Sequence, residues 1–299
     1  MVGAACTAWA IKRYYDGWRP ITAVRYLADL GQSSDAGAPR YNAQGLPLIP
    51  NLIELVTPAT IGSGRHAGLA ANSLAVLAWP GQPANSQTTY RGVKWVQANE
   101  WVTYQKTNFV SPAFPGYVSG HSTFSRAAAE VLTAITGSPF FPSGMGIHDA
   151  PANTGLVNER GPSVAIQMQW GTYFDAADQA GISRIWGGIH PPADDFGGRI
   201  AGSQAGQAVW ALAQKYFDGS VVNTPVNVAF RPLPGGEHEV KLNTLRGLHY
   251  KLQSSTDLNQ GFTDDNGGGF TLMTDTSLAR TNPTAGPQKY YRAAAALTP

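Results

Sequence analysis

The sequence predicts a mainly α protein with long loops, followed by a small all-β module. Residues 1–219 carry apolar side chains at helical spacing, separated by loops rich in Gly and Pro. Residues 220–299 contain short alternating polar and apolar runs with turn residues between them, a pattern typical of an antiparallel β-sandwich. We therefore expect a helical-bundle domain over 1–219 and a β-sandwich module over 220–299.

Composition and charge exclude several classes of protein. The chain has 299 residues and a formal net charge of +2, too little to indicate a nucleic acid or a membrane surface as partner. No apolar stretch approaches the roughly 20 residues that span a bilayer. Cys6 is the only cysteine, which excludes an intrachain disulfide and a multi-thiolate metal site.

The pattern of the N-terminal third predicts helices on either side of one long loop. Residues 1–30 are expected to be helical with a break at Pro20, because proline suits the first turn of a new helix. Residues 31–68 are loop-like. A short helix is expected at 69–79 and a longer one at 92–106.

Three further helices are expected. The first leaves the stretch at 117–125 and ends near Thr136, the second covers 163–184, and the third covers 193–217. Glycines inside the third indicate close packing against another helix: Gly197, Gly198, Gly202 and Gly206. The connecting loops are longer than those of a plain bundle, which indicates that they line a site.

Polar residues cluster late in the β-rich part. They are Asp257, Asn259, Asp264, Asp265 and Asn266. Such a cluster suits either a calcium site or the polar tip of a loop, and the loop tip is favoured because Asp and Asn are common turn residues.

The central motif is Ser119-Gly120-His121, placed where a Pro/Gly-rich loop becomes a helix. Unpaired N–H groups and the positive dipole end make a helix start a natural anion site. Here a hydroxyl, a glycine that admits close approach and a titratable imidazole share one turn. The alternative is an ordinary N-cap.

Two other motifs carry cations and a second imidazole. Lys12 and Arg19 are seven positions apart, so a helix would present both on nearly the same face. Asp194 follows His190 by four positions, and a carboxylate at that spacing can orient an imidazole by accepting its ring N–H. The alternatives are solvated lysine and arginine side chains, a structural histidine and an Arg184–Asp194 surface ion pair.

Taken together, the three motifs supply the groups expected of an oxyanion-binding site. Three cations, a hydroxyl, a main-chain donor and two imidazoles suit a tetrahedral or trigonal-bipyramidal anion, with guanidinium groups on its oxygens. Phosphate and vanadate both fit this description.

The order and spacing of these residues carry a family resemblance. Lys-x6-Arg-Pro, then Ser-Gly-His, then Ser-Arg-x5-His-x3-Asp resembles the three-part signature of vanadium-dependent haloperoxidases and type 2 phosphatidic acid phosphatases. The resemblance covers about residues 9–217. Val118 departs from it, because many members have proline before Ser-Gly-His, but this position shapes the turn without touching the anion.

The haloperoxidase branch implies a role for each site residue. His190 would be the vanadium ligand, Asp194 its orienting carboxylate, and His121 the acid–base group. The vanadate oxygens would be held by Lys12, Arg19, Ser119, Gly120 and Arg184. Trp9 and Phe114 resemble the aromatic residues of the halide pocket. Vanadate as cofactor, hydrogen peroxide and halide as substrates, and hypohalous acid that halogenates a small organic acceptor follow from the same resemblance. Bromide is the expected halide, and Phe114 favours chloride as well.

Two other functions stay open. In the phosphatase branch His190 would attack phosphorus and His121 would protonate the leaving group. The β-rich tail also allows a non-catalytic surface or binding protein with a relic site. Trp9, Phe114 and the lack of membrane spans, which lipid phosphatases usually have, favour vanadate.

The N-terminus bears on localisation. Residues 1–10 lack the charged and apolar regions of a signal peptide, and the first motif begins almost at once, so we expect that an N-terminal part is missing. Low charge with abundant Gly, Pro and Trp favours a secreted or periplasmic protein. The sequence indicates no oligomeric state.

Overall fold

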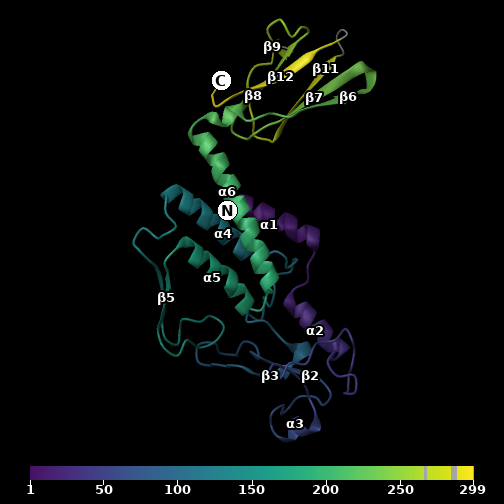
Figure 1. Cartoon of the computed structure of the whole chain (residues 1–299), viewed down its shortest axis with the longest axis vertical. Helices are drawn as coiled ribbons and strands as arrows, with labels where there is room; N and C mark the ends of the chain where they lie inside the picture. Colours follow the sequence, from purple (N-terminus) through teal and green to yellow (C-terminus); the bar gives the residue numbers. More distant parts are fainter. Residues whose placement is uncertain (266–267, 284–287, 299) are drawn as a thin grey trace. The chain divides into compact units, whose positions relative to one another are not determined.

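A computed structural model of the chain describes residues 1–265, 268–283 and 288–298 (Figure 1). The chain divides into two compact units, Met1–Trp210 and Ala211–Pro299, and each is described by itself. This division falls inside the last long helix, and the domain limits 1–219 and 220–299 stay an interpretation of the sequence.

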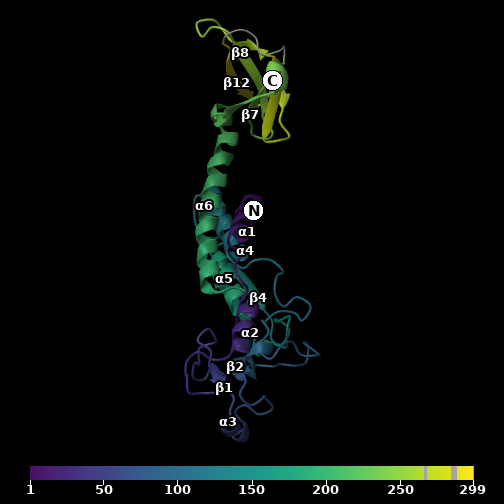
Figure 2. The same ribbon diagram turned by 90° about the vertical axis from the view of Figure 1, so that its right-hand side faces the viewer.

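Helices form the centre of the first unit. They are α1 (Val2–Tyr15), α2 (Pro20–Leu30), α3 (Pro58–Gly62), α4 (Gly120–Thr136), α5 (Tyr173–Trp186) and α6 (Pro192–Phe217), which continues into the second unit. Pro20 is the first residue of α2, as predicted. Gly137 ends α4 in the left-handed region, where glycine is unstrained. Figures 1 and 2 show α4 and α5 beside the first part of α6.

The glycines of α6 explain how closely it packs on α4. A Cβ on Gly198 would lie 2.8 Å from the carbonyl oxygen of Ser119, and one on Gly202 would clash with the carbonyl oxygen of Thr123. Gly206 meets the backbone of Ala127 in the same way. One face of α6 therefore lies directly on the backbone of α4, and the close packing predicted from the glycines is confirmed.

Three predicted helices are wrong in whole or in part. The segment 69–79 contains strand β2 (Leu74–Ala78), and 92–106 contains β3 (Lys94–Gln97) followed by a 3₁₀ turn, η1 (Ala98–Glu100). The segment 163–184 begins with β5 (Ile166–Trp170) before α5 starts. These runs are four or five residues long, and periodicity does not distinguish strand from helix at that length.

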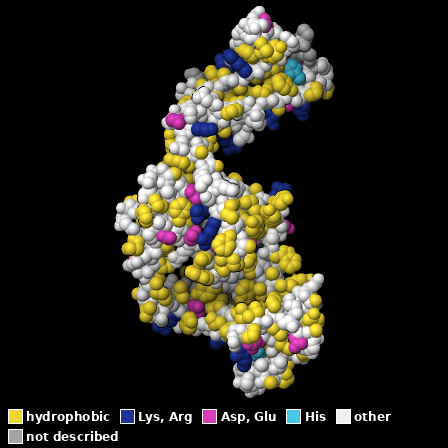
Figure 3. Space-filling model, in the orientation of Figure 1, with side chains coloured by type: hydrophobic (Ala, Val, Ile, Leu, Met, Phe, Trp, Pro, Cys, Tyr) yellow, Lys and Arg dark blue, Asp and Glu magenta, His cyan; other side chains and the backbone are white. Residues whose placement is uncertain are grey.

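Small antiparallel sheets extend the first unit. β2 lies between β1 (Ile53–Leu55) and β3, and β5 pairs with β4 (Gly146–Ala150). A description as mainly α therefore fits only roughly. Large hydrophobic side chains are widespread on the visible face of this unit (Figure 3). Those of α1 that are exposed include Val2, Trp9, Tyr14 and Tyr15.

The second unit holds the β-strands predicted for the C-terminal part. One sheet has the order β11–β7–β6, and the other has β10–β8–β12 with β9 also paired to β8. Their bounds are β6 Val228–Pro232, β7 Glu237–Asn243, β8 His249–Ser255, β9 Thr263–Asp264, β10 Thr271–Leu272, β11 Ser277–Pro283 and β12 Tyr290–Ala296. Two 3₁₀ turns, η2 (Ser220–Asn223) and η3 (Pro234–Gly236), precede and interrupt them. Both sheets contribute to one apolar core that includes Val240, Leu242, Tyr250 and Leu252.

The acidic cluster of this unit has basic partners. Asp264 pairs with Lys251 at 2.8 Å, and Asp265 pairs with Lys289 at 2.7 Å. The side chain of Asp257 accepts from the backbone N–H of Asn259, as in an Asx turn. Asn266 lies outside the described residues. These contacts favour the polar loop over a calcium site.

The packing of α6 gives a first prediction. Gly202→Ala should lower the free energy of unfolding by about 2 kcal/mol, because the new methyl group meets the α4 backbone, which has no room to yield. Gly62→Ala is the control. Gly62 is also helical, nothing lies within 4 Å of its would-be Cβ, and the change should be neutral or slightly stabilising. Urea unfolding of both variants measures the difference, and equal stability would contradict the packing argument.

Candidate active site

The start of α4 carries the central motif. Ser119 is the N-cap, and its buried hydroxyl oxygen accepts from the backbone N–H of Ser122 at 3.4 Å. The backbone N–H of Ser119 donates to the carbonyl oxygen of Asp194 at 2.9 Å. This bond joins the first turn of α4 to the first turn of α6. Ser119 is therefore an N-cap and is also placed beside the third motif.

The His190 side chain is held in one tautomer. Its Nδ1 lies 2.6 Å from Oδ2 of Asp194, and its Nε2 lies 2.9 Å from Nη1 of Arg19. Arginine can only donate, so Nε2 must accept and the ring proton must sit on Nδ1, where it donates to the carboxylate. Burial lowers the pKa of His190, and the hydrogen bond that its ring donates to Asp194 opposes that effect. The outcome is a neutral imidazole whose Nε2 lone pair faces the cations.

Lys12 and Arg19 approach from α1 and from the residue before α2. Nζ of Lys12 donates to the carbonyl oxygens of Pro115 at 2.8 Å and Gly116 at 2.7 Å. Arg19 donates to the carbonyl oxygens of Phe114 at 3.0 Å and Ile189 at 2.9 Å. Both side chains are buried, so the loop before α4 is fixed by two cations.

Trp9 and Phe114 lie against these cations. Their ring centroids are 5.2 Å apart, and Nζ of Lys12 is 5.3 Å from the Phe114 ring and 5.9 Å from that of Trp9. The Cζ of Arg19 lies 5.1 Å from the Phe114 ring. Trp9 and Phe114 are 45% and 40% exposed, so they form a partly open aromatic wall beside the cations.

The remaining predicted site residues are Gly120, His121 and Arg184. Gly120 begins α4, and a Cβ there would lie 3.8 Å from Trp9. Burial lowers the pKa of His121, and the nearby charge of Arg184 lowers it further. Arg184 lies in the last turn of α5 and donates from Nε to Oγ of Ser183 at 3.1 Å. The structure thus brings the three sequence motifs together.

The charge balance of the site favours an anion. Burial and the charge of Arg19 lower the pKa of Lys12 to about 8, and burial lowers the pKa of Arg19 and of Arg184. In the described part of the chain, none of these three cations forms an ion pair with a carboxylate. Asp194 offsets part of the charge of Lys12 and Arg19, but the cations of the site outnumber this carboxylate. Buried charge that is not fully compensated is costly, so an oxyanion fits this donor set. Vanadate and phosphate meet that requirement equally.

A buried network beneath the site was missed by the sequence analysis. Oγ of Ser122 donates to Oδ1 of Asp195 at 2.6 Å, and Oδ2 of Asp195 pairs with Arg199 at 2.8 Å. Arg199 also pairs with Asp178 of α5 at 2.7 Å. Asp195 is 1% exposed and ties the first turn of α4 to α6. The available signal was the pair of adjacent acidic residues at the start of a helix.

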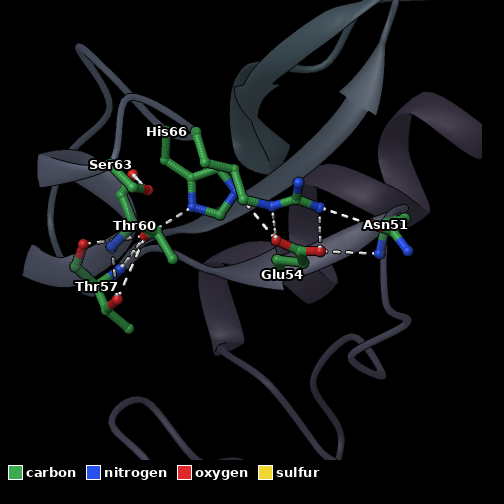
Figure 4. Close-up of polar contacts among 7 residues, drawn as sticks. Asn51, Glu54, Thr57, Thr60, Ser63 and His66 are labelled. Atoms are coloured by element: carbon green, nitrogen blue, oxygen red, sulfur yellow. Dashed lines mark hydrogen bonds and ion pairs between the residues drawn. The ribbon is translucent and has the colours of Figure 1, made fainter.

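Other histidines lie in different surroundings. His66 is fully buried, with Nδ1 2.9 Å from Oγ1 of Thr60 and Nε2 3.3 Å from Glu54 (Figure 4). Glu54 also pairs with Arg65 at 2.7 Å, which lowers the pKa of Glu54 to about 2. These contacts fix the loop after β1. His148 is an exposed residue of β4.

Buried cations around an oriented imidazole, on a helical scaffold, form a donor set suited to an oxyanion. The family model described as the VCPO second helical-bundle domain matches residues 1–219. The chain therefore belongs to this vanadium haloperoxidase-like family. No curated protein matches the chain.

Three solved structures are similar to parts of the chain. A holo-type bacterial vanadium-dependent chloroperoxidase has 19% identity and a TM-score of 0.47, covering 70% of this chain and 33% of its own. The apo-type enzyme has 20% identity and a TM-score of 0.49, covering 72% and 34%. A bacterial vanadium-dependent iodoperoxidase has 31% identity and a TM-score of 0.27, covering 38% and 23%. The chain thus spans about a third of the length of the chloroperoxidases.

The buried network gives a second prediction. Asp195→Ala should lower the free energy of unfolding by about 3 kcal/mol, because Ser122 loses its acceptor and Arg199 loses its buried partner. Asp178→Ala is the control. It removes another partner of Arg199, but its side chain is 40% exposed, so the loss should stay below about 1 kcal/mol. Thermal or urea unfolding compares the two, and an equal loss would contradict the role of Asp195.

Proposed function

We propose that the protein is a vanadate-dependent haloperoxidase. It would use hydrogen peroxide to oxidise bromide, and also chloride, to hypohalous acid that halogenates a small organic acceptor. The observation that carries the proposal is the Nε2 lone pair of His190, oriented by Asp194 and placed among buried cations.

The chain's own groups divide into holding and proton-transfer roles. Nε2 of His190 would ligate vanadium. The oxygens would be held by Lys12, Arg19, Ser119, Gly120 and Arg184. Bound vanadate would supply a Lewis acid that activates peroxide at neutral pH. The cations are fixed before the anion arrives, which suits electrostatic stabilisation without reorganisation.

His121 would manage the protons. Its lowered pKa keeps the imidazole neutral near neutral pH, so it can accept a proton from incoming peroxide and return it to the departing hypohalous acid. Asp194 keeps the proton of His190 on Nδ1 throughout. Trp9 and Phe114 would place halide beside Lys12, whose Nζ lies over both rings.

The phosphatase function is the runner-up, because the same Nε2 lone pair is also suited to attack phosphorus. A relic site in a binding protein is the third candidate, and the set of buried cations speaks against it, since an unused cluster of this kind costs stability. We also propose secretion or export to the periplasm. No described helix is long and apolar enough to cross a membrane.

The third prediction concerns the reaction itself. With orthovanadate and peroxide, the purified protein should brominate a chromogenic diketone, and His190→Ala should abolish this, since it removes the vanadium ligand. Exposed His148→Ala should keep full activity. Hydrolysis of an aryl phosphate without vanadate is measured in parallel.

Each result selects one function. Vanadate-dependent bromination lost only in His190→Ala supports the haloperoxidase. Phosphate hydrolysis that vanadate inhibits, without bromination, would move the protein to the phosphatase branch. If the protein shows neither activity and binds no oxyanion, the result would support the binding protein with a relic site.

The fourth prediction uses the pKa of Lys12. Because burial sets that pKa near 8, Lys12 loses its positive charge as the pH rises through about 8. Affinity for tungstate, a tetrahedral dianion whose charge is constant in neutral and alkaline solution, should fall about tenfold across this range. Lys12→Met should bind weakly at all these pH values and show no such step. Calorimetric titration measures both, and an identical pH profile in the variant would contradict this role.

A further inference from the structure

A second recess lies beside the oxyanion site. It is a cavity of about 650 Å³, lined by residues 104–106, Phe109, 155–158 and the end of α5, Ser183, Arg184, Trp186 and Gly187. Ligand pockets in proteins measure roughly 300–1,000 Å³, so the cavity has room for a drug-sized molecule. Its α5 wall belongs to the third sequence motif, a few residues before His190.

The walls of this cavity are mainly apolar and aromatic. Trp186 and Phe109 are 70% and 54% exposed, and Leu156 and Val157 are exposed as well. Large aromatic faces open to water at a recess are typical of binding sites for flat apolar molecules.

The charges of the cavity have one sign. Lys106 and Arg184 are the charged members of its lining, and both are cations. An anionic group on the ligand would therefore be attracted to the cavity. Lys106 is exposed, whereas Arg184 is half-buried in the last turn of α5.

Arg184 connects the cavity to the oxyanion site. Its carbonyl oxygen accepts from the backbone N–H of Ile189 at 3.1 Å, directly before His190, and its charge also contributes to the lowered pKa of His121. A molecule held in the cavity would therefore lie next to the groups that hold the oxidising centre. That position matters, because hypohalous acid reacts with whatever it meets first.

We propose that this cavity binds the organic acceptor, and that the acceptor is an electron-rich phenol carrying a carboxylate. The inference rests on the proposed function. Trp186 and Phe109 would hold the phenol ring and Lys106 the carboxylate. In the reaction the O–X bond of hypohalous acid breaks and a C–X bond forms at the ring carbon ortho to the hydroxyl. The ring proton leaves with the hydroxide to form water.

Binding is tested without the cofactor. Calorimetry with 3-(4-hydroxyphenyl)propionate as probe should show saturable binding, and Trp186→Ala should weaken it at least about tenfold. Lys106→Met should weaken it about fivefold, while the binding of the matching propionamide should not change. Lys94→Met, an exposed lysine of β3 outside the cavity, is the control and should leave both affinities unchanged.

Catalysis separates this inference from the proposed function. In a mixture of the phenol and the chromogenic diketone, Trp186→Ala should lower the ratio of phenol to diketone halogenation. Diketone halogenation with no phenol binding, or with a ratio that Trp186→Ala leaves unchanged, would overturn the subsite while the haloperoxidase stands. Phenol binding without any halogenation would sink the proposed function and, with it, the assignment of this ligand as acceptor.

Discussion

The site depends on one backbone hydrogen bond, from the N–H of Ser119 to the carbonyl oxygen of Asp194. It joins two helix starts that are far apart in the sequence. The adjacent residues of α6 then act in opposite directions: Asp194 turns its carboxylate toward His190, while Asp195 holds Ser122. Because both contacts come from one turn of helix, the first turn of α4 and the imidazole keep a fixed distance. The glycine face of α6 makes this approach possible.

The second constraint is electrostatic. Two cations are buried beside an imidazole, and a third is half-buried, with one carboxylate among them already engaged by the ring. Backbone carbonyl oxygens satisfy their hydrogen bonds but contribute no compensating charge. The folded chain therefore carries a localised positive field that a small, highly charged oxyanion relieves. Burial, which disfavours the charged form, lowers the pKa of every one of these basic groups.

The sequence predicted the long helices from local signals, and it predicted the assembly of the three motifs from the resemblance of their order and spacing to a known family. The residue type alone indicates the role of three positions: Pro20 begins a helix, Ser119 caps one, and Gly202 allows close helix packing. It did not predict β2, β3 and β5, because such short runs take their conformation from the strand that they pair with. The sequence also did not predict the buried network of Asp195, or the aromatic cavity near Trp186. Both are made by segments that meet only in the folded chain.

The loop before α4 shares its anchors with any bound anion. Phe114, Pro115 and Gly116 are tied down by the same nitrogen atoms of Lys12 and Arg19 that would face the oxyanion. Occupancy of the site and rigidity of this loop are therefore linked, and linkage of this kind is reciprocal. An anion that leaves these hydrogen bonds intact adds contacts to the nitrogen atoms that hold the loop, and so fixes the loop and the Phe114 ring more firmly. Anion binding at the site would thus stabilise the aromatic wall formed by Trp9 and Phe114.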